Sequence, residues 1–301
     1  MNHQAGWKTR PPFRNLASTS YPVALNVVRA GVENVLQRPP QNAMRAHDSP
    51  LARFLEPFVS GLWILFVLVS LLAGAIWTFG IGEGSLERLV TNPGLRATLV
   101  WLLAQVDFAW ITLAAANVYL SLATCFGIAT ARRWALIILS AVMVAAWLSV
   151  FTGFPLGRIR YGTALGPKLG SVPVGLPLFW FSVIVSAREA VLRVRSRCGQ
   201  RPLAASVGLI AMLTDLNLEP LAVKYRGFWF WTAPTPDLPP GFDFPFTGSL
   251  AWGVLAAVLT LGLRELEVAD SAQKSPWPPI ITLAIFEVVF LASHVTHRLS
   301  Y

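Results

Sequence analysis

Seven apolar runs of near-membrane length constrain this chain more than any other feature. A helix needs about 20 apolar residues to cross a bilayer, and only helices and closed barrels can satisfy their backbone there. Hydrophobic residues make up 54% of the 301 residues and charged residues only 13%, whereas soluble domains carry about 25% charge. The sequence therefore predicts an all-α, polytopic membrane protein with about seven transmembrane helices. The expected spans are residues 58–79, 108–130, 134–151, 172–187, 202–218, 247–263 and 278–293.

The second apolar run, at residues 95–129, is longer than one helix perpendicular to the membrane requires. We place the span at residues 108–130 and residues 95–106 at the interface. One long tilted helix is the alternative.

The chain before the first span has a different composition. Residues 1–53 are polar, basic and proline-containing, and such segments bury too little apolar surface to fold. We expect a mostly disordered cytoplasmic tail at 1–53 and a helical transmembrane domain at 54–301. With seven spans, about two thirds of the 24 lysines and arginines lie on the side of the tail. The positive-inside rule then places the N-terminus in the cytoplasm, in a bacterial-type cytoplasmic membrane.

The net charge of +9 is explained by this topology, so we expect no nucleic-acid partner. Cys125 and Cys198 lie far apart in the sequence and lack the spacing of a metal site or a disulfide framework. No oxygen-rich ligand set suited to magnesium stands out. We therefore expect neither a metal nor another cofactor. The histidines, which form no ligand cluster, are His3, His47, His294 and His297.

Two long loops rich in proline, glycine and aromatic residues fall on the non-cytoplasmic side, at residues 152–171 and 219–246. They are too rich in helix breakers to be helices and too apolar to be ordinary solvent loops. Non-helical backbone near membrane depth is tolerated where it lines a cavity. The loops form one site if they meet, which the sequence leaves open.

Two carboxylates, Asp215 and Glu219, stand at the end of the fifth span. A spacing of four puts both on one helical face, and acids at lipid depth are unfavourable unless paired or used. In low-dielectric surroundings a carboxylic acid can stay protonated near neutral pH, and two close carboxylates resist ionising together. We therefore predict a catalytic pair in which one acid donates a proton and the other orients water.

Aromatic residues near these acids can stabilise a cation through their π faces. We predict that Tyr161, Trp180, Trp229 and Trp231 bind substrate. Alternatives stay open for each of them. The two later tryptophans also suit an interfacial belt, and the other two residues also suit ordinary packing.

Ion pairing is the alternative for the acids, because Lys224, Arg226 or Arg160 could pin the loop to them. Asp107 lies where the second span enters the membrane, which favours interface placement over a proton relay. Glu287 lies midway along the seventh span, with His294 on the same helical face as a candidate partner. A carboxylate at that depth is a functional hypothesis by default.

The two loops and the acids together resemble the carotenoid biosynthesis membrane family that includes the CruF-type carotenoid 1',2'-hydratases. The resemblance covers about residues 100–265. This sequence has Glu219 where the family usually has Asp, and Gly248 where the family has Asn. The matching residues are Thr152, Gly153, Pro155, Gly157, Tyr161, Leu165, Gly166, Lys168, Leu169, Val172, Pro173, Pro177 and Trp180 in the first motif. They are Asp215, Glu219, Pro220, Ala222, Gly227, Trp229 and Trp231 in the second motif, and Pro245 and Trp252 in a weaker third.

The resemblance implies a hydro-lyase that adds water to the terminal C1'=C2' double bond of an acyclic or monocyclic carotene, such as lycopene or γ-carotene. Its partners would be a carotene in the bilayer and water, with contact to other carotenoid enzymes as a further expectation. Two alternatives stay open. Alkene protonation also starts cyclisation, so a carotenoid cyclase fits the same residues. A non-catalytic transporter or lipid-binding scaffold fits Glu287 and the basic tail.

Overall fold

A computed structural model describes residues 50–79, 91–195, 198–232, 246–263 and 276–299 of the chain. The side chains of residues 71–79, 97, 99–104 and 293–299 are outside this description. The tail predicted at residues 1–53 therefore lies almost wholly outside the described residues.

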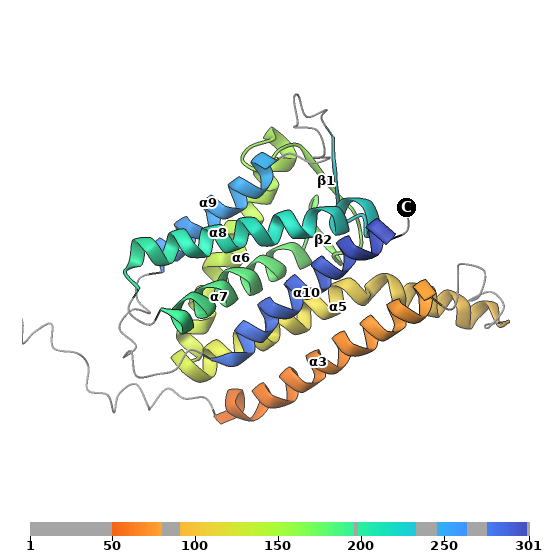
Figure 1. The fold of residues 1–301 in the computed structure, drawn as a ribbon, viewed down its shortest axis with the longest axis horizontal. Helices are drawn as coiled ribbons and strands as arrows, with labels where there is room; N and C mark the ends of the chain where they lie inside the picture. Colours follow the sequence, from red (N-terminus) through yellow and green to blue (C-terminus); the bar gives the residue numbers. More distant parts are fainter. Residues whose placement is uncertain (1–49, 80–90, 196–197, 233–245, 264–275, 300–301) are drawn as a thin grey trace, which may run out of the picture. The chain divides into compact units, whose positions relative to one another are not determined.

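Seven α-helices make up most of the described chain (Figure 1). Two short antiparallel ribbons of strands and one π-helical turn complete it. The helices are α3 (Pro50–Phe79), α5 (Pro93–Phe126), α6 (Ile128–Thr152), α7 (Gly175–Val194), α8 (Gln200–Pro220), α9 (Phe246–Gly262) and α10 (Trp277–Leu299). The strands are β1 (Ile159–Tyr161), β2 (Lys168–Leu169), β3 (Val172–Pro173) and β4 (Trp229–Trp231), and the π-helix is η1 (Leu221–Tyr225).

The predicted all-α, polytopic membrane fold is confirmed. Five helices are long and apolar enough to cross a membrane, namely α3, α5, α6, α7 and α8 with η1. The apolar helix α9 and the segment Trp277–Ala292 of α10 are shorter. Large apolar side chains such as Leu68, Leu136 and Val258 are exposed on the helices, as lipid-facing positions require.

Helix α3 starts at Pro50, before the span predicted from residue 58, and α10 continues to Leu299, beyond the span predicted to end at residue 293. Two further differences concern the boundaries of α5, α6 and α7. The second span is one long helix from Pro93 to Phe126, and α6 starts at Ile128 rather than at Trp134. The break falls at Gly127, whose φ of 85° suits glycine and interrupts both helices. Arg132 and Arg133, which fall between the spans predicted at 108–130 and 134–151, lie inside the first turns of α6.

The second difference concerns the fourth span, predicted at residues 172–187. Helix α7 continues to Val194, so Arg188 and Glu189 are helical and buried rather than part of a loop. The two side chains form an ion pair, and the Arg188 guanidinium lies 5.0 Å from the Trp134 ring of α6. Mutual pairing and this cation–π contact allow the charges to stay inside the bundle.

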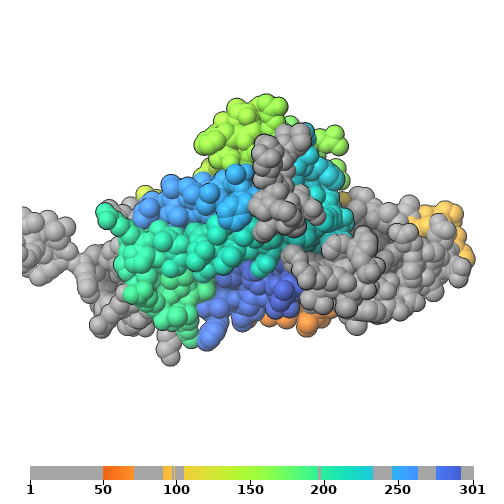
Figure 2. Space-filling model, turned by 45° about the horizontal axis from the view of Figure 1, so that its top comes forward, coloured from red at the N-terminus to blue at the C-terminus, as the bar shows by residue number. Residues whose placement is uncertain are grey.

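Helix α7 is the most buried of the spanning helices and packs against α5, α6, α8 and α10. Helices α8 and α9 run side by side, as Figures 1 and 2 both show. Their contact is close because glycines face each other: a Cβ at Gly208 would lie 2.6 Å from the Gly253 carbonyl oxygen. Small residues at a helix crossing let two backbones approach in a membrane.

Buried polar side chains link α3, α5 and α10. Ser60 hydrogen-bonds Asn117, whose amide nitrogen donates to the Thr282 hydroxyl at 3.3 Å. Interhelical hydrogen bonds of this kind stabilise a bundle that lacks a hydrophobic driving force between its helices.

The two long loops rich in proline, glycine and aromatic residues meet, which the sequence had left open. Strand β1 from the first loop pairs antiparallel with β4 from the second, with Ile159 opposite Trp231 and Tyr161 opposite Trp229. A hydrogen bond from the Gly162 nitrogen to the Phe228 oxygen, 2.8 Å long, continues the ribbon. The two loops therefore form one structure over the end of α8.

Candidate active site

The β1–β4 ribbon presents one face to the helices and one to the outside. Side chains alternate along a strand, and directly opposite residues share a face. Arg160 and Phe230 are opposite each other and exposed. The residues of the inward face are Ile159, Tyr161, Trp229 and Trp231. The two-residue spacing of the tryptophans therefore directs both indoles toward the end of α8.

Glycines make room for the Trp231 ring. A Cβ at Gly157 would lie 2.7 Å from Trp231 Cζ3, and one at Gly248 would lie 3.0 Å from Trp231 Cη2. Gly157 also has a φ of 99°, which side-chain-bearing residues rarely adopt. The first loop and the start of α9 together hold this indole in place.

Asp215 and Glu219 lie one turn apart on α8 and are 1% and 2% exposed. The Trp229 Nε1–H donates to Glu219, lying 3.3 Å from both carboxyl oxygens. Glu219 is also within electrostatic range of Asp215. The predicted pair is thus brought together, and the indole fixes the orientation of the second carboxyl group.

Two of the basic residues considered as partners for these acids, Arg226 and Arg160, take other positions. Arg226 binds Asp107 instead, with its Nη2 at 2.6 Å and its Nε at 2.8 Å from the carboxylate Oδ2. Arg160 lies on the outward face of the ribbon. Asp107 is therefore part of an ion pair that ties α5 to the segment between η1 and β4.

Several buried polar atoms around Asp215 have no hydrogen-bond partner among the described residues. They are both Asp215 carboxyl oxygens, the Tyr161 hydroxyl, the Ser249 hydroxyl and Trp231 Nε1. Almost all buried polar groups in native proteins are hydrogen-bonded. A cluster of exceptions around a carboxyl pair therefore indicates a binding site for a polar molecule.

Tyr161 is 4% exposed and lies within electrostatic range of both acids. Burial raises the pKa of its phenol, and the Asp215 and Glu219 carboxylates raise that pKa further. The side chain is therefore a neutral hydroxyl that can donate a hydrogen bond at any physiological pH.

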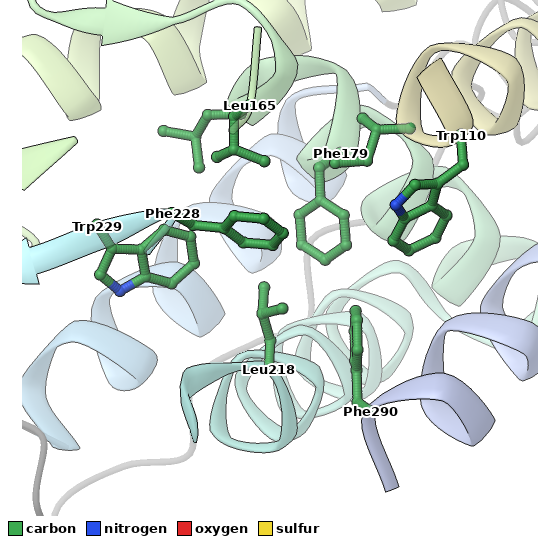
Figure 3. Close-up of a pocket in the computed structure, with 9 residues that line it drawn as sticks. Trp110, Leu165, Phe179, Leu218, Phe228, Trp229 and Phe290 are labelled. Carbon is green, nitrogen blue, oxygen red and sulfur yellow. The ribbon is translucent and has the colours of Figure 1, made fainter. Parts of the chain in front are cut away.

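An apolar pocket lies on the other side of Trp229 (Figure 3). The free space inside it is about 10 Å³, about the size of one water molecule. Figure 3 shows Trp229 at one end of the pocket and Trp110 at the other, with aromatic rings between them. The lining residues are Trp110, Ile111, Leu165, Leu176, Phe179, Leu218, Phe228, Trp229 and Phe290.

The four aromatic residues predicted to bind substrate occupy different places. Trp229 lines the pocket, while Tyr161 and Trp231 are on the carboxyl side of it. Trp180 stacks on Trp252 of α9, with ring centroids 4.2 Å apart. Only Trp229 among the four therefore contacts both the pocket and a carboxyl group.

Glu287 of α10 binds α8 next to the carboxyl pair. It accepts hydrogen bonds from the Thr214 hydroxyl at 2.5 Å and the Asn217 amide at 2.7 Å. These donors flank Asp215 in sequence, so Glu287 fixes the part of α8 that carries the pair. The predicted partnership with His294 lies outside the described side chains.

Among the described residues, no three His, Cys, Asp or Glu side chains gather as a metal site would require. The absence of a metal or cofactor stays a prediction.

The profile of the carotenoid biosynthesis protein family matches residues 105–299. The chain belongs to this carotenoid biosynthesis family. It is also 35% identical over 120 residues to the bisanhydrobacterioruberin hydratase of Haloarcula japonica. That similarity covers 38% of the chain and 38% of the relative, so well under two thirds of the relative's length is matched. No solved structure matches the chain.

The family match extends beyond the region of resemblance found in the sequence and includes Glu287. The sequence predicted the carboxyl pair and Trp229, which the structure brings together, and it gave no sign of Ser249 or of most of the pocket wall. Ser249 stands in an ordinary apolar helix, and nothing in its surroundings distinguishes it from a packing serine. Phe228 carried a weak signal, since it begins the aromatic run that includes both inward tryptophans.

Proposed function

We propose that the protein is a carotenoid hydratase, a hydro-lyase that adds water to the terminal C1'=C2' double bond of an acyclic or monocyclic carotene. Lycopene and γ-carotene are the substrates we expect. One observation carries the proposal: Trp229 belongs both to the apolar pocket and to the contact with the buried Glu219 carboxyl group. The family and the hydratase relative support the same reaction class.

The reaction needs an acid, because an isolated alkene is too weak a base for water to protonate. We assign this role to Glu219, which shares Trp229 with the pocket. Its proton adds to C2' and leaves a tertiary cation at C1'. Water forms the C1'–O bond, the oxonium proton passes to Asp215, and return of a proton to Glu219 completes the cycle.

The cation forms beside aromatic rings. Trp229 lines the pocket, and Phe228 and Phe179 supply further rings. A cation over an aromatic face is stabilised by about 1–2 kcal/mol when both are desolvated. Such stabilisation acts on the charged intermediate and not on the neutral alkene, so it lowers the barrier.

We propose that the pocket admits one end of a carotene. Its free space is about 10 Å³, so its side chains must move apart to admit the end of an alkene. The rest of the polyene would lie among lipid tails. The protein is an integral membrane protein, and we propose that its N-terminus is cytoplasmic and its two loops non-cytoplasmic. A reporter enzyme that is active only outside the cytoplasm should then be active when it is fused after Thr232.

Expression in a lycopene-producing bacterium, followed by pigment mass analysis, tests the function. The wild-type protein is expected to add the mass of one water per modified end. The variants D215N and E219Q should each abolish that product while accumulating in the membrane at wild-type level. Full product formation by both variants would remove the carboxyl pair from the mechanism.

Cyclisation is the second candidate, because every residue that lines the pocket is apolar or aromatic. A cation kept from water can react with a neighbouring double bond instead. Mass analysis separates the two reactions, since cyclisation leaves the mass unchanged.

A further inference from the structure

Ser249 takes no part in the proton transfer described above, yet it faces the carboxyl pair. It is fully buried, and its hydroxyl has no hydrogen-bond partner among the described residues. Helices α8 and α9 cross with Gly208 against Gly253 and Ala257, and with Gly253 against Met212. The helices are therefore antiparallel, and one turn from Gly253 brings Ser249 opposite Asp215. The two side chains are near enough to interact but do not form a direct hydrogen bond.

Two more polar groups lie around the same acids. The Tyr161 hydroxyl is within electrostatic range of both carboxyl groups, and Trp231 is within range of Glu219. Both polar atoms are buried and lack a described partner. A buried water needs two to four polar partners. The cluster offers an acceptor in Asp215, a donor in Tyr161 and a hydroxyl in Ser249 that can do both.

This polar cluster is separate from the apolar pocket. None of Asp215, Tyr161 and Ser249 lines the pocket, and Trp229 and Leu218 form the wall on that side. The site thus has an apolar part that suits the end of an alkene and a polar part that suits water. Glu219 is in contact with the indole between them, and this indole must turn aside for the water to reach the alkene.

We propose that Ser249, with Asp215 and Tyr161, binds and orients the water molecule that is added to the substrate. The inference rests on the proposed hydratase function and deepens it. Ser249 and Tyr161 hold the water, its oxygen lone pair forms the C1'–O bond, and Asp215 accepts the proton that the oxonium loses. Without this water, the cation returns a proton from C2' to the Glu219 carboxylate, which restores the alkene, or loses one from a methyl group, which gives an isomeric alkene.

The roles of Ser249 and Glu219 can be separated in D₂O. Purified full-length protein is incubated with lycopene in liposomes, and hydrated product and deuterium in recovered lycopene are measured by mass spectrometry. Protonation in D₂O adds deuterium to C2', so reversal of the cation leaves deuterium in the alkene. Deuterium therefore reports proton donation, and the hydrated product reports capture by water.

The variant S249A is expected to lower hydrated product about tenfold, the effect of one lost hydrogen bond of ~1.4 kcal/mol. Deuterium in recovered lycopene should stay at or above the wild-type level. E219Q should lose both signals. The matched control is S121A, because Ser121 is also a fully buried serine without a described partner. It lies 14 residues from Asp107 along α5, about 21 Å toward the far end of that helix, and should behave as wild type.

Wild-type hydration by S249A would overturn the inference, as would parallel loss of both signals at normal membrane levels. If S249A does not accumulate, S249C serves the same test, because its thiol fills the space but is a weak hydrogen-bonding group. A wild-type protein that neither hydrates nor deuterates lycopene would instead refute the proposed function.

Discussion

Replacing Trp229 separates the two contributions that this residue makes to the site. The variant W229F keeps an aromatic wall on the pocket but removes the indole N–H that lies 3.3 Å from both Glu219 oxygens. A net hydrogen bond contributes about 1 kcal/mol, and 1.36 kcal/mol corresponds to tenfold in rate. W229F should therefore hydrate carotene about fivefold more slowly.

The variant W229A loses the aromatic face as well. A desolvated cation–π contact adds about 1–2 kcal/mol, so the rate should fall at least about thirtyfold in total. The assay is the initial rate of hydrated carotene formation per amount of protein in the membrane. W147F is the matched control, because its indole also donates a hydrogen bond, to the Leu169 oxygen at 3.0 Å, but outside the site.

Two results would refute this reasoning about Trp229. A wild-type rate for W229F would mean that the indole N–H does not orient the Glu219 carboxyl group. Equal rates for W229F and W229A would mean that the aromatic face gives no stabilisation to the cation.

Three further predictions concern the surroundings of the pair. E287L leaves the Thr214 hydroxyl without its acceptor and should lower the unfolding free energy by about 1–3 kcal/mol, measured as a fall in melting temperature, whereas E287L combined with T214V should recover part of the loss. G157A places a Cβ 2.7 Å from the Trp231 ring at a residue with a φ of 99°. It should reduce the rate of hydration, while limited proteolysis should show that the far end of the bundle stays folded. Because the pKa of Tyr161 is raised on folding, the folded state holds this proton more tightly than the unfolded one, so stability should fall as pH rises above about 10. Y161F should show a shallower fall in thermal unfolding scans across that range, and an identical slope would contradict the burial of this phenol beside the acids.

The helices were predictable because their signal is strong and local. Apolar runs of membrane length identify seven helices, and a spacing of four places Asp215 and Glu219 on one face without knowledge of the fold. A predicted helix boundary was wrong where the backbone conformation of one residue, and not the composition of the segment, ends the helix. Gly127 ends α5 through its backbone conformation, whereas the predicted boundary lay a few positions later, at Arg132 and Arg133.

Long-range pairings could not be predicted in the same way. Strands β1 and β4 have three residues each and are 67 positions apart in sequence, so neither carries enough local pattern to reveal its partner. The burial of Arg188 depends on Glu189 beside it and on Trp134 of another helix. The role proposed for Ser249 depends on its position opposite Asp215 of the neighbouring helix, and the close crossing of α8 and α9 sets that position.

The narrowness of the apolar pocket has a consequence for the order of events on a long symmetrical molecule. If lycopene is the substrate as proposed, a pocket that admits one chain end would modify each end of lycopene in a separate binding event. To be modified twice, the pigment must withdraw into the lipid, reverse its direction and enter again. Singly hydroxylated pigment should therefore build up first wherever enzyme is scarce, and the doubly hydroxylated form should follow only after the unmodified pool has been depleted.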